Sequence, residues 1–237
     1  MIVPAYNEAA LLARLLGTLK IAADRAPGGA AQVELIVADN ASTDATAEIA
    51  RQHRCRVVPV AKRAIAAARN GGAHVARGEW LCFVDADMQV HPDTFNAIDR
   101  AVQTGKVIGG ATGVRSERWS PGIVATWAVI LPMVWVTGLD TGVVFCRRSD
   151  FETIGGYRED RLYAEDVAFA AALKRLGRSR GQRLVRLRSA KAIVSTRKFD
   201  KHGDWHQLLA MGRLCWNQLL APAKAEREVQ AYWYEDR

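Results

Sequence analysis

The sequence predicts an α/β fold, a single domain in which helices flank a mainly parallel central sheet. Two observations predict this class. In the first 90 residues, four short apolar runs alternate with segments whose apolar residues recur at helical spacing. Clusters of polar residues follow three of these runs, as they do at the carboxyl ends of parallel strands. With 237 residues, 49% of them hydrophobic and 24% charged, the chain has the composition of one large globular domain.

The elements of the first half follow from apolar runs and turn residues. Asn7 is expected to cap a helix that carries leucines at helical spacing, and this helix ends at Pro27-Gly28-Gly29. The other expected elements are strands at 1–4, 33–38, 56–60 and 80–84 and helices at 45–53 and 64–76. Helical crossovers between strands imply parallel pairing, so the polar segments 4–8, 39–44 and 85–87 should meet at one end of the sheet.

The second half alternates less strictly. A helix is expected at 92–103 and another from Ala164 to Gly177. Gly155-Gly156-Tyr157 is expected to form a turn before the second of these helices. The expected strands are 107–114, 141–147, 184–187 and 192–195. No internal repeat and no low-complexity linker divides the chain, which supports a single domain.

The longest apolar run, Ile123 to Leu139, contains no charged residue and is interrupted by Pro132 and Gly138. This length is at the short limit for a membrane span. We expect a buried helix or helical hairpin, and the alternative is a segment that lies at a membrane surface. The chain starts without the pattern of a secretory signal. A cytoplasmic location is therefore expected, peripheral at the cytoplasmic membrane face in the alternative.

The net charge of +8 is unevenly distributed. No acid lies between Asp166 and Asp200, where ten basic residues occur: Lys174, Arg175, Arg178, Arg180, Arg183, Arg186, Arg188, Lys191, Arg197 and Lys198. A nucleotide diphosphate, a lipid phosphate, an anionic membrane or nucleic acid could neutralise such a stretch, and a solvated basic face is the alternative. The four cysteines are dispersed, so neither a disulfide framework nor a zinc site is expected.

Asp85-Ala86-Asp87 directly follows the apolar run 80–84. Residues two apart in a strand point to the same side, so the two carboxylates should lie together at the strand's end. Two adjacent carboxylates repel each other, and a hard divalent cation such as Mg²⁺ or Mn²⁺ relieves this repulsion. The alternative interpretation is a polar turn that ends the strand.

Five motifs occur in one order: Val3-Pro4-Ala5-Tyr6-Asn7-Glu8, Val37-Ala38-Asp39-Asn40-Ala41-Ser42-Thr43-Asp44, Ala68-Arg69-Asn70-Gly71-Gly72, Asp85-Ala86-Asp87 and Tyr163-Ala164-Glu165-Asp166. Together they resemble the family 2 glycosyltransferases, inverting enzymes with the GT-A fold that use nucleotide-diphospho-sugars. The resemblance implies a nucleotide-sugar-binding half at 1–90, an acceptor and catalytic half at 91–200 and a C-terminal helical extension at 201–237. Because the chain begins close to Pro4, the first strand is expected to be short.

The resemblance also implies roles for the donor-side residues. Pro4, Ala5 and Glu8 would line the nucleoside pocket, Tyr6 would stack on the base and Asp39 would accept its hydrogen bonds. Arg69 would face the base or the diphosphate, Asp85 the ribose or the metal, and Asp87 the metal. The alternatives are a core aromatic for Tyr6 and an exposed, salt-bridging side chain for Arg69.

On the acceptor side, the resemblance implies that Asp166 is the general base, with Glu165 as the alternative base or as an acceptor ligand. Capping of the following helix is the alternative for both acids. Arg197 and Lys198 would contact the diphosphate or a phosphate-bearing acceptor. His202 or His206 either completes the metal shell or is an ordinary surface histidine.

The implied activity is the transfer of one sugar, because the chain lacks the Q-x-x-R-W motif of processive synthases. We expect a UDP-sugar donor, an Mg²⁺ or Mn²⁺ cofactor, and an acceptor that is a glycan, a lipid or a polyprenyl phosphate; no nucleic acid partner is expected. One alternative is a noncatalytic protein of this fold that binds nucleotides or an anionic membrane. The other is a sugar-phosphate nucleotidyltransferase, although the first strand is not followed by the glycine-rich basic loop that such an enzyme needs.

Overall fold

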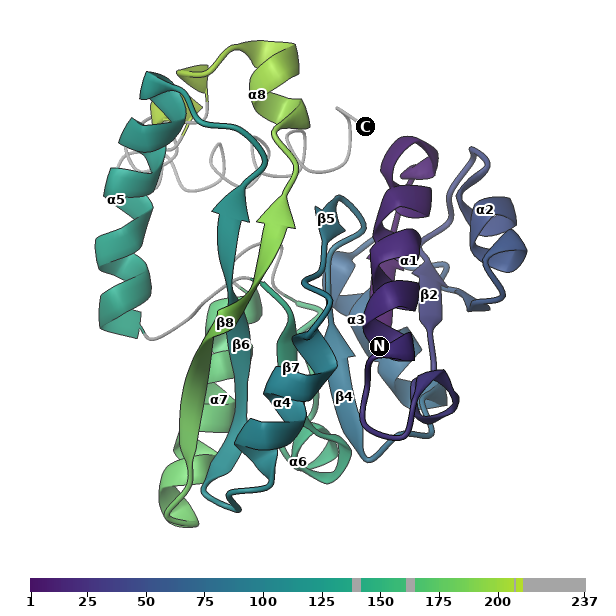
Figure 1. Cartoon of the computed structure of the whole chain (residues 1–237), viewed down its shortest axis with the longest axis vertical. Coiled ribbons are helices and arrows are strands. Elements are labelled where there is room, and N and C mark those ends of the chain that lie inside the picture. The colour runs from purple at the N-terminus through teal and green to yellow at the C-terminus, as the bar shows by residue number, and fades with distance from the viewer. Residues whose placement is uncertain (138–141, 161–164, 207, 211–237) are drawn as a thin grey trace.

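The computed structural model describes residues 1–137, 142–160, 165–206 and 208–210 (Figure 1). Its elements in chain order are β1 (Ile2–Ala5), α1 (Ala9–Asp24), the 3₁₀ helix η1 (Ala30–Gln32), β2 (Ile36–Asp39), α2 (Thr46–Gln52), β3 (Arg56–Pro59), α3 (Ile65–Val75), β4 (Trp80–Phe83), β5 (Met88–Gln89), α4 (Thr94–Val102), β6 (Val107–Ser116), α5 (Pro121–Thr137), β7 (Val144–Arg147), α6 (Arg148–Thr153), α7 (Glu165–Ser179), β8 (Arg183–Val194) and α8 (Arg197–His202).

The strands of the described residues form one eight-stranded sheet in the order β3-β2-β1-β4-β7-β6-β8-β5. Four of its pairings are parallel, β1 with β2, β2 with β3, β1 with β4 and β6 with β8. The pairings of β7 with β4 and β6, and of β5 with β8, are antiparallel. The predicted α/β class with a mainly parallel sheet is therefore confirmed, and β7 joins the first half of the sheet to the second.

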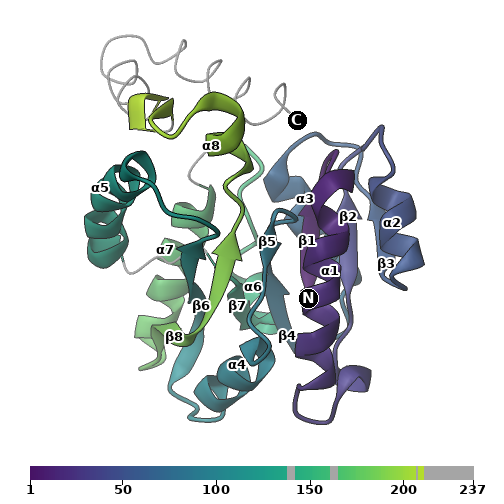
Figure 2. The ribbon, with the colours of Figure 1, turned by 45° about the horizontal axis from the view of Figure 1, so that its top comes forward.

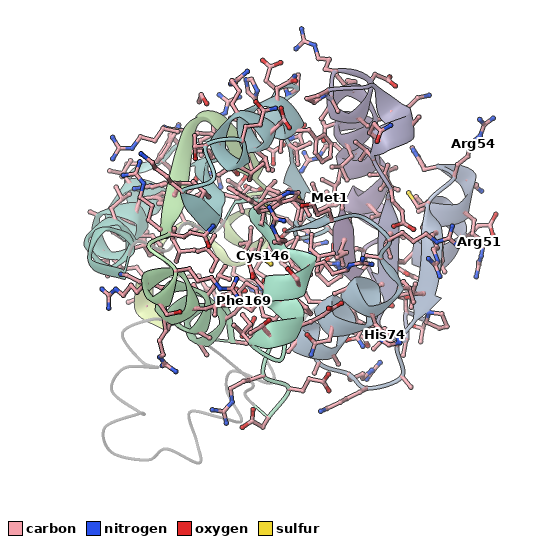
Figure 3. The ribbon with its side chains drawn as sticks, turned by 90° about the horizontal axis from the view of Figure 1, so that it is seen from below. Met1, Arg51, Arg54, His74, Cys146 and Phe169 are labelled. Atoms are coloured by element: carbon pink, nitrogen blue, oxygen red, sulfur yellow. The ribbon has the colours of Figure 1, made fainter. Side chains whose placement is uncertain are left out.

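Two cores cover the two faces of this sheet. One core contains residues of α1, α2 and α4, and the other contains residues of α3, α6 and α7. Neighbouring strand residues alternate between them, since Val37 belongs to the first core and Ile36 to the second. Figure 3 shows Cys146 and Phe169 of the second core in the interior, whereas Arg51, Arg54 and His74 lie at the outside of the molecule.

Helix α3 lies unusually close to the sheet because it carries glycine where it crosses β1. A Cβ atom at Gly72 would lie 2.4 Å from Ile2 Cγ2 and 3.5 Å from Ala38 Cβ. Ile2 is fully buried and β-branched, so its side chain has little freedom to move. Arg69 and Asn70 lie less than one turn before Gly72 on α3, so this close approach also sets how near their backbone lies to the sheet.

Two details, the extent of β8 and the cap of α1, differ from the sequence-based expectations. The two short strands predicted at 184–187 and 192–195 are one strand, β8, because β8 pairs with β6 along its length and an irregularity between Thr112 and Val114 absorbs the intervening residues. Asn7 does not cap α1. Its side chain accepts a hydrogen bond from Thr43 N (2.8 Å), and Asp44 Oδ2 accepts one from Ala9 N (3.0 Å) in the first turn of α1. The cap thus comes from the β2–α2 loop.

The apolar run after residue 120 forms one helix, α5, rather than a hairpin over the described residues, and this helix is only partly buried. Ile123 and Thr126 are buried, whereas Val124 and Val129 are exposed. The prediction of a buried segment is wrong for the outward side, because α5 lies at the edge of the second half and the other described elements leave that side uncovered (Figures 1 and 2). Among the described helices, none combines the length and the apolar character needed to cross a membrane.

The packing of α3 leads to a stability prediction. Gly72→Ala should lower the free energy of unfolding by about 1–3 kcal/mol, because the added methyl group overlaps Ile2 in a packed core. Gly17→Ala in α1 is the matched control. A Cβ there meets no atom within 4 Å, so the substitution should stabilise the helix by about 0.5–1 kcal/mol. Urea unfolding of both variants measures the difference, and equal effects would contradict the close-packing interpretation.

Candidate active site

The carboxyl ends of three adjacent strands bring the predicted donor-side residues together. Parallel register pairs Ala5 at the end of β1 with Asp39 at the end of β2. On the other side of β1, Val84 N donates to Ile2 O (3.1 Å), which places Asp85 one residue beyond the β1–β4 pairing. The predicted convergence of the three polar segments follows from this register.

The first two motifs interlock through backbone and side-chain hydrogen bonds. Asn40 N donates to Ala5 O (2.8 Å), Asn7 N to Ser42 Oγ (3.0 Å) and Glu8 N to Thr46 Oγ1 (2.8 Å). Asn7 adopts a left-handed conformation (φ 51°), which asparagine tolerates well. These bonds hold the loops after β1 and β2 in one arrangement, with Pro4 and Ala5 buried beneath them.

Two donor-side residues have partners within the protein. The Arg63 guanidinium lies 4.6 Å from the centre of the Tyr6 ring and donates to the Tyr6 hydroxyl. Asp39 Oδ1 accepts a hydrogen bond from Ser42 N (3.2 Å) and remains half-buried at the end of β2. Tyr6 is therefore a buried aromatic with a cation against its ring, the geometry of a cation–π pair.

Arg69 is the centre of the site. Its side chain is only 6% exposed, and its Nη1 lies 2.6 Å from Asp166 Oδ1 and 3.1 Å from Glu165 Oε1, while its Nη2 lies 3.1 Å from Asp85 Oδ1. One guanidinium thus joins the end of β4 to the start of α7. Burial alone would lower the pKa of Arg69, but the three carboxylates outweigh this effect and raise the pKa well above its ordinary value. The side chain therefore carries a full positive charge.

An aromatic cluster beneath the site positions Arg69. The Arg69 guanidinium lies 5.0 Å from the centre of the Tyr157 ring, and that ring stacks on Phe169 of α7 at 4.1 Å. Asn70, the next residue on α3, accepts a hydrogen bond from Tyr157 N (2.9 Å) and donates to Tyr157 O (2.9 Å). Adjacent residues of α3 therefore hold both the ring and the backbone of Tyr157.

The surroundings of Asp166 favour its protonated form. Loss of hydration, together with the neighbouring carboxylates Glu165 and Asp85, raises the pKa of Asp166 to about 6, although Arg69 acts in the opposite direction. Yet 43% of its side chain remains exposed, so the carboxylate is accessible to a substrate. Glu165 is almost buried, at 10% exposure, which makes it the inner acid of the pair. A carboxylate with a pKa near 6 suits proton transfer close to neutral pH.

The two acids of the Asp-x-Asp motif meet the requirements of a divalent cation in part. The Asp85 side chain is 40% exposed and Asp87 is half-buried, so both reach the surface at the end of β4. Their oxygens are the ligands that Mg²⁺ and Mn²⁺ prefer. No group of three His, Cys, Asp or Glu side chains able to hold a metal occurs among the described residues. The remaining ligands would have to come from water or from a bound phosphate.

The predicted phosphate-binding segment reaches the same region from α8. Arg197 Nη1 lies 3.1 Å from Glu8 Oε2 and Nη2 lies 3.3 Å from Glu8 Oε1, so two predicted ligand-binding residues neutralise each other here. Lys198 follows on α8 and is half-buried. The rings of His202 and His206 stack on each other, with centres 4.7 Å apart.

Sequence reasoning missed four residues that shape the site: Arg63, Asn70, Tyr157 and Glu159. Glu159 accepts hydrogen bonds from Asn70 Nδ2 (2.9 Å) and Lys62 Nζ (2.9 Å). Asn70 and Tyr157 both lie in segments that the sequence singled out, one beside Arg69 and one in the Gly-Gly-Tyr turn. Their mutual contact depends on the packing of α3 and could not be predicted from either segment. Tyr163 and Ala164 of the last motif lie outside the described residues.

Comparison with known proteins gives concordant results. The family model for Glycosyl transferase family 2 matches residues 1–176. Validoxylamine A glucosyltransferase from Streptomyces hygroscopicus subsp. jinggangensis is 35% identical over 104 residues, which are 41% of this chain and 24% of that relative. The putative glycosyltransferase EpsH from Bacillus subtilis is 33% identical over 66 residues, or 26% of this chain and 19% of that relative. The matched regions thus span a quarter or less of these relatives.

Two solved structures share the fold. TarS 1–349 from S. aureus in complex with UDP-GlcNAc has a TM-score of 0.64 at 19% identity and covers 82% of this chain and 57% of its own. The mannosyltransferase PcManGT from Pyrobaculum calidifontis in complex with GDP-Man and Mn²⁺ has a TM-score of 0.60 at 22% identity, covering 81% of this chain and 55% of its own. With its family match over most of its length and its GT-A fold, the chain belongs to glycosyltransferase family 2.

Proposed function

We propose that this glycosyltransferase moves a single sugar from a UDP-sugar to a hydroxyl group of its acceptor, with inversion at the anomeric carbon. The observation that carries the proposal is the contact of one buried guanidinium with Asp85 on the donor side and Asp166 on the acceptor side. These acids are far apart in the sequence: Asp85 follows β4, and Asp166 lies in the first turn of α7. Their juxtaposition suits a direct transfer between two substrates bound side by side.

Asp166 acts as the general base. It is the more exposed acid of its pair, and its pKa of about 6 leaves it ionised at neutral pH while it remains a good proton acceptor. It takes the proton of the acceptor hydroxyl as the oxygen attacks the anomeric carbon, and the bond to the nucleoside diphosphate breaks. A single displacement of this kind inverts the configuration of that carbon. Glu165, held by Arg69 and nearly buried, orients the base or the acceptor.

Asp85 and Asp87 would hold Mg²⁺ or Mn²⁺ at the donor end of the site. When bound, such a cation supplies positive charge to the diphosphate leaving group, where negative charge develops. PcManGT with GDP-Man and Mn²⁺ gives a precedent in the same fold. Pro4, Ala5, Tyr6, Glu8 and Asp39 surround the nucleoside, and Arg197 and Lys198 face its phosphates. Arg69 organises the acids from below instead of contacting the base.

The donor nucleotide can be identified directly by calorimetric titration of UDP and GDP into the protein, each with and without Mn²⁺. We expect UDP to bind at least about tenfold more tightly with Mn²⁺ than without it, since a cation held by Asp85 and Asp87 would attract the negatively charged diphosphate. Metal-dependent binding of GDP alone would overturn the choice of UDP. Absence of any nucleotide binding would favour the noncatalytic alternative, and pyrophosphate release from a nucleoside triphosphate would favour nucleotidyl transfer.

Asp87 and Asp166 have different proposed roles, so substitution of the first should affect donor binding and substitution of the second should affect turnover. Asp87→Ala should abolish metal-dependent donor binding, because it removes a cation ligand. Asp166→Asn should leave donor binding intact and lower turnover by about 10²–10⁴-fold, because the amide cannot accept the proton. Calorimetry and an assay of sugar transfer measure the two properties separately. Full turnover in the Asp166→Asn protein would exclude this residue as the base.

The raised pKa of Asp166 predicts a pH profile. Since the base must be deprotonated, kcat/KM should rise with pH through a midpoint near 6 and level off above it. Glu165→Gln should move this midpoint to lower pH, because it removes a neighbouring negative charge that raises the pKa of Asp166.

The measurement is the pH dependence of kcat/KM between about pH 5 and 8 for both proteins. Circular dichroism at each pH serves as the control for folding. A midpoint that does not respond to Glu165→Gln, or one that moves upward, would contradict the assignment of Asp166.

A further inference from the structure

The exposed apolar side chains of this protein gather in one region. Seven large hydrophobic residues are exposed among the described residues, and six of them lie in two segments, 119–131 and 205–209. These six are Trp119, Val124, Val129, Leu131, Trp205 and Leu209, and we call them the apolar surface. Leu209 is 70% exposed, and both tryptophans are more than half exposed. The seventh of these described residues, Ile21, lies elsewhere, on α1.

The two segments are joined into one surface by direct contacts. Arg118, just before α5, donates to Asp200 Oδ1 (2.8 Å) and to Asp204 Oδ1 (2.6 Å). The start of α5 packs on the same loop, because a Cβ atom at Gly122 would lie 2.6 Å from Asp204 O. Figures 1 and 2 show α5 and α8 at the same end of the second half, on the side away from α1. The start of α5 and the segment that carries Trp205 and Leu209 are therefore neighbours at one end of the molecule.

The outward side of α5 is apolar over residues 121–131, the part of this helix whose side chains the structure describes. No charged residue occurs between Trp119 and Leu139, and Val124, Ala128 and Leu131 form an exposed stripe at helical spacing. A surface helix in contact with water normally carries polar residues there. Exposed apolar patches of this kind mark contacts with a partner or with lipid. A helix too short to span a bilayer can still lie in the plane of the interface with such a face in the lipid.

Charge distinguishes a membrane from a second copy of the protein. The chain carries a net charge of +8, and no acid lies between Asp166 and Asp200. Among the described residues, three acids close to the apolar surface in the sequence are paired with arginines: Glu117 with Arg14, and Asp200 and Asp204 with Arg118. Two copies of so basic a chain would repel each other, whereas an anionic bilayer attracts it. The exposed tryptophans suit the boundary between headgroups and acyl chains, where this residue is enriched.

We propose that the apolar surface binds anionic membranes peripherally, with α5 lying in the plane of the lipid interface and Trp119 and Trp205 inserted at headgroup level. Helix α8 connects this surface to the candidate active site, because its Arg197 contacts Glu8 there. The proposed membrane-binding surface is therefore connected to the candidate active site through a single short helix. The proposal stands on the surface alone and does not depend on the identity of the donor.

The test is flotation of the full chain with vesicles of phosphatidylcholine alone or with about 30% phosphatidylglycerol. We expect binding to the anionic vesicles, weakened by salt. Val124→Asp should lower the partition coefficient at least about tenfold, because it places a charge in the apolar stripe. Ile21→Asp is the matched control, since Ile21 is exposed to the same extent, 52%, on a helix on the other side of the molecule. Its binding should be unchanged.

Circular dichroism melting of both variants shows whether they fold as the parent does, and tryptophan fluorescence provides a second readout. Trp119→Ala and Trp205→Ala should reduce the blue shift that anionic vesicles cause in the parent protein. Absence of flotation, or equal loss in the Val124→Asp and Ile21→Asp proteins, would overturn the proposal. Concentration-dependent dimerisation that Val124→Asp abolishes, without vesicle binding, would instead assign the apolar surface to a second copy.

Discussion

The arrangement of the site depends on one buried positive charge. Arg69 contacts Asp85, Glu165 and Asp166 while its side chain is almost inaccessible to water. Three neighbouring carboxylates repel one another unless a cation lies between them, and burying the charge of an arginine is costly unless carboxylates pair with it. Each group therefore requires the others. These contacts tie the end of β4 to the start of α7 where substrates would meet.

This charge can be placed there only because α3 lies close to the sheet. Gly72 removes the side chain that would separate α3 from Ile2, and Tyr157 stacks on Phe169 to form an apolar support under the guanidinium. Asn70 then holds the backbone of Tyr157. The packing of α3 and of the aromatic rings thus determines where the charge of Arg69 lies. The aromatic cluster excludes water from one side of Arg69, and the acids compensate its charge from the other side.

The charged residues of the site differ in how far they are exposed to solvent. Glu165 and Arg69 are nearly buried and keep the site in one arrangement, whereas Asp85 and Asp166 expose about two fifths of their side chains. The Glu8–Arg197 pair extends this arrangement to α8, the short helix that leads to the apolar surface. A substrate can therefore approach acids whose positions are already determined by the protein.

The sequence by itself determined the fold class, the family and the convergence of polar residues at the strand ends, because alternation of strands and helices and the parity of strand residues are local properties. The tertiary structure decided which groups touch. It placed Arg69 under the acids, paired Arg197 with Glu8, gave the cap of α1 to Asp44 and left one side of α5 exposed. Each of these outcomes depends on which elements become neighbours and how closely they approach, and residue patterns along the chain do not specify distances of that kind.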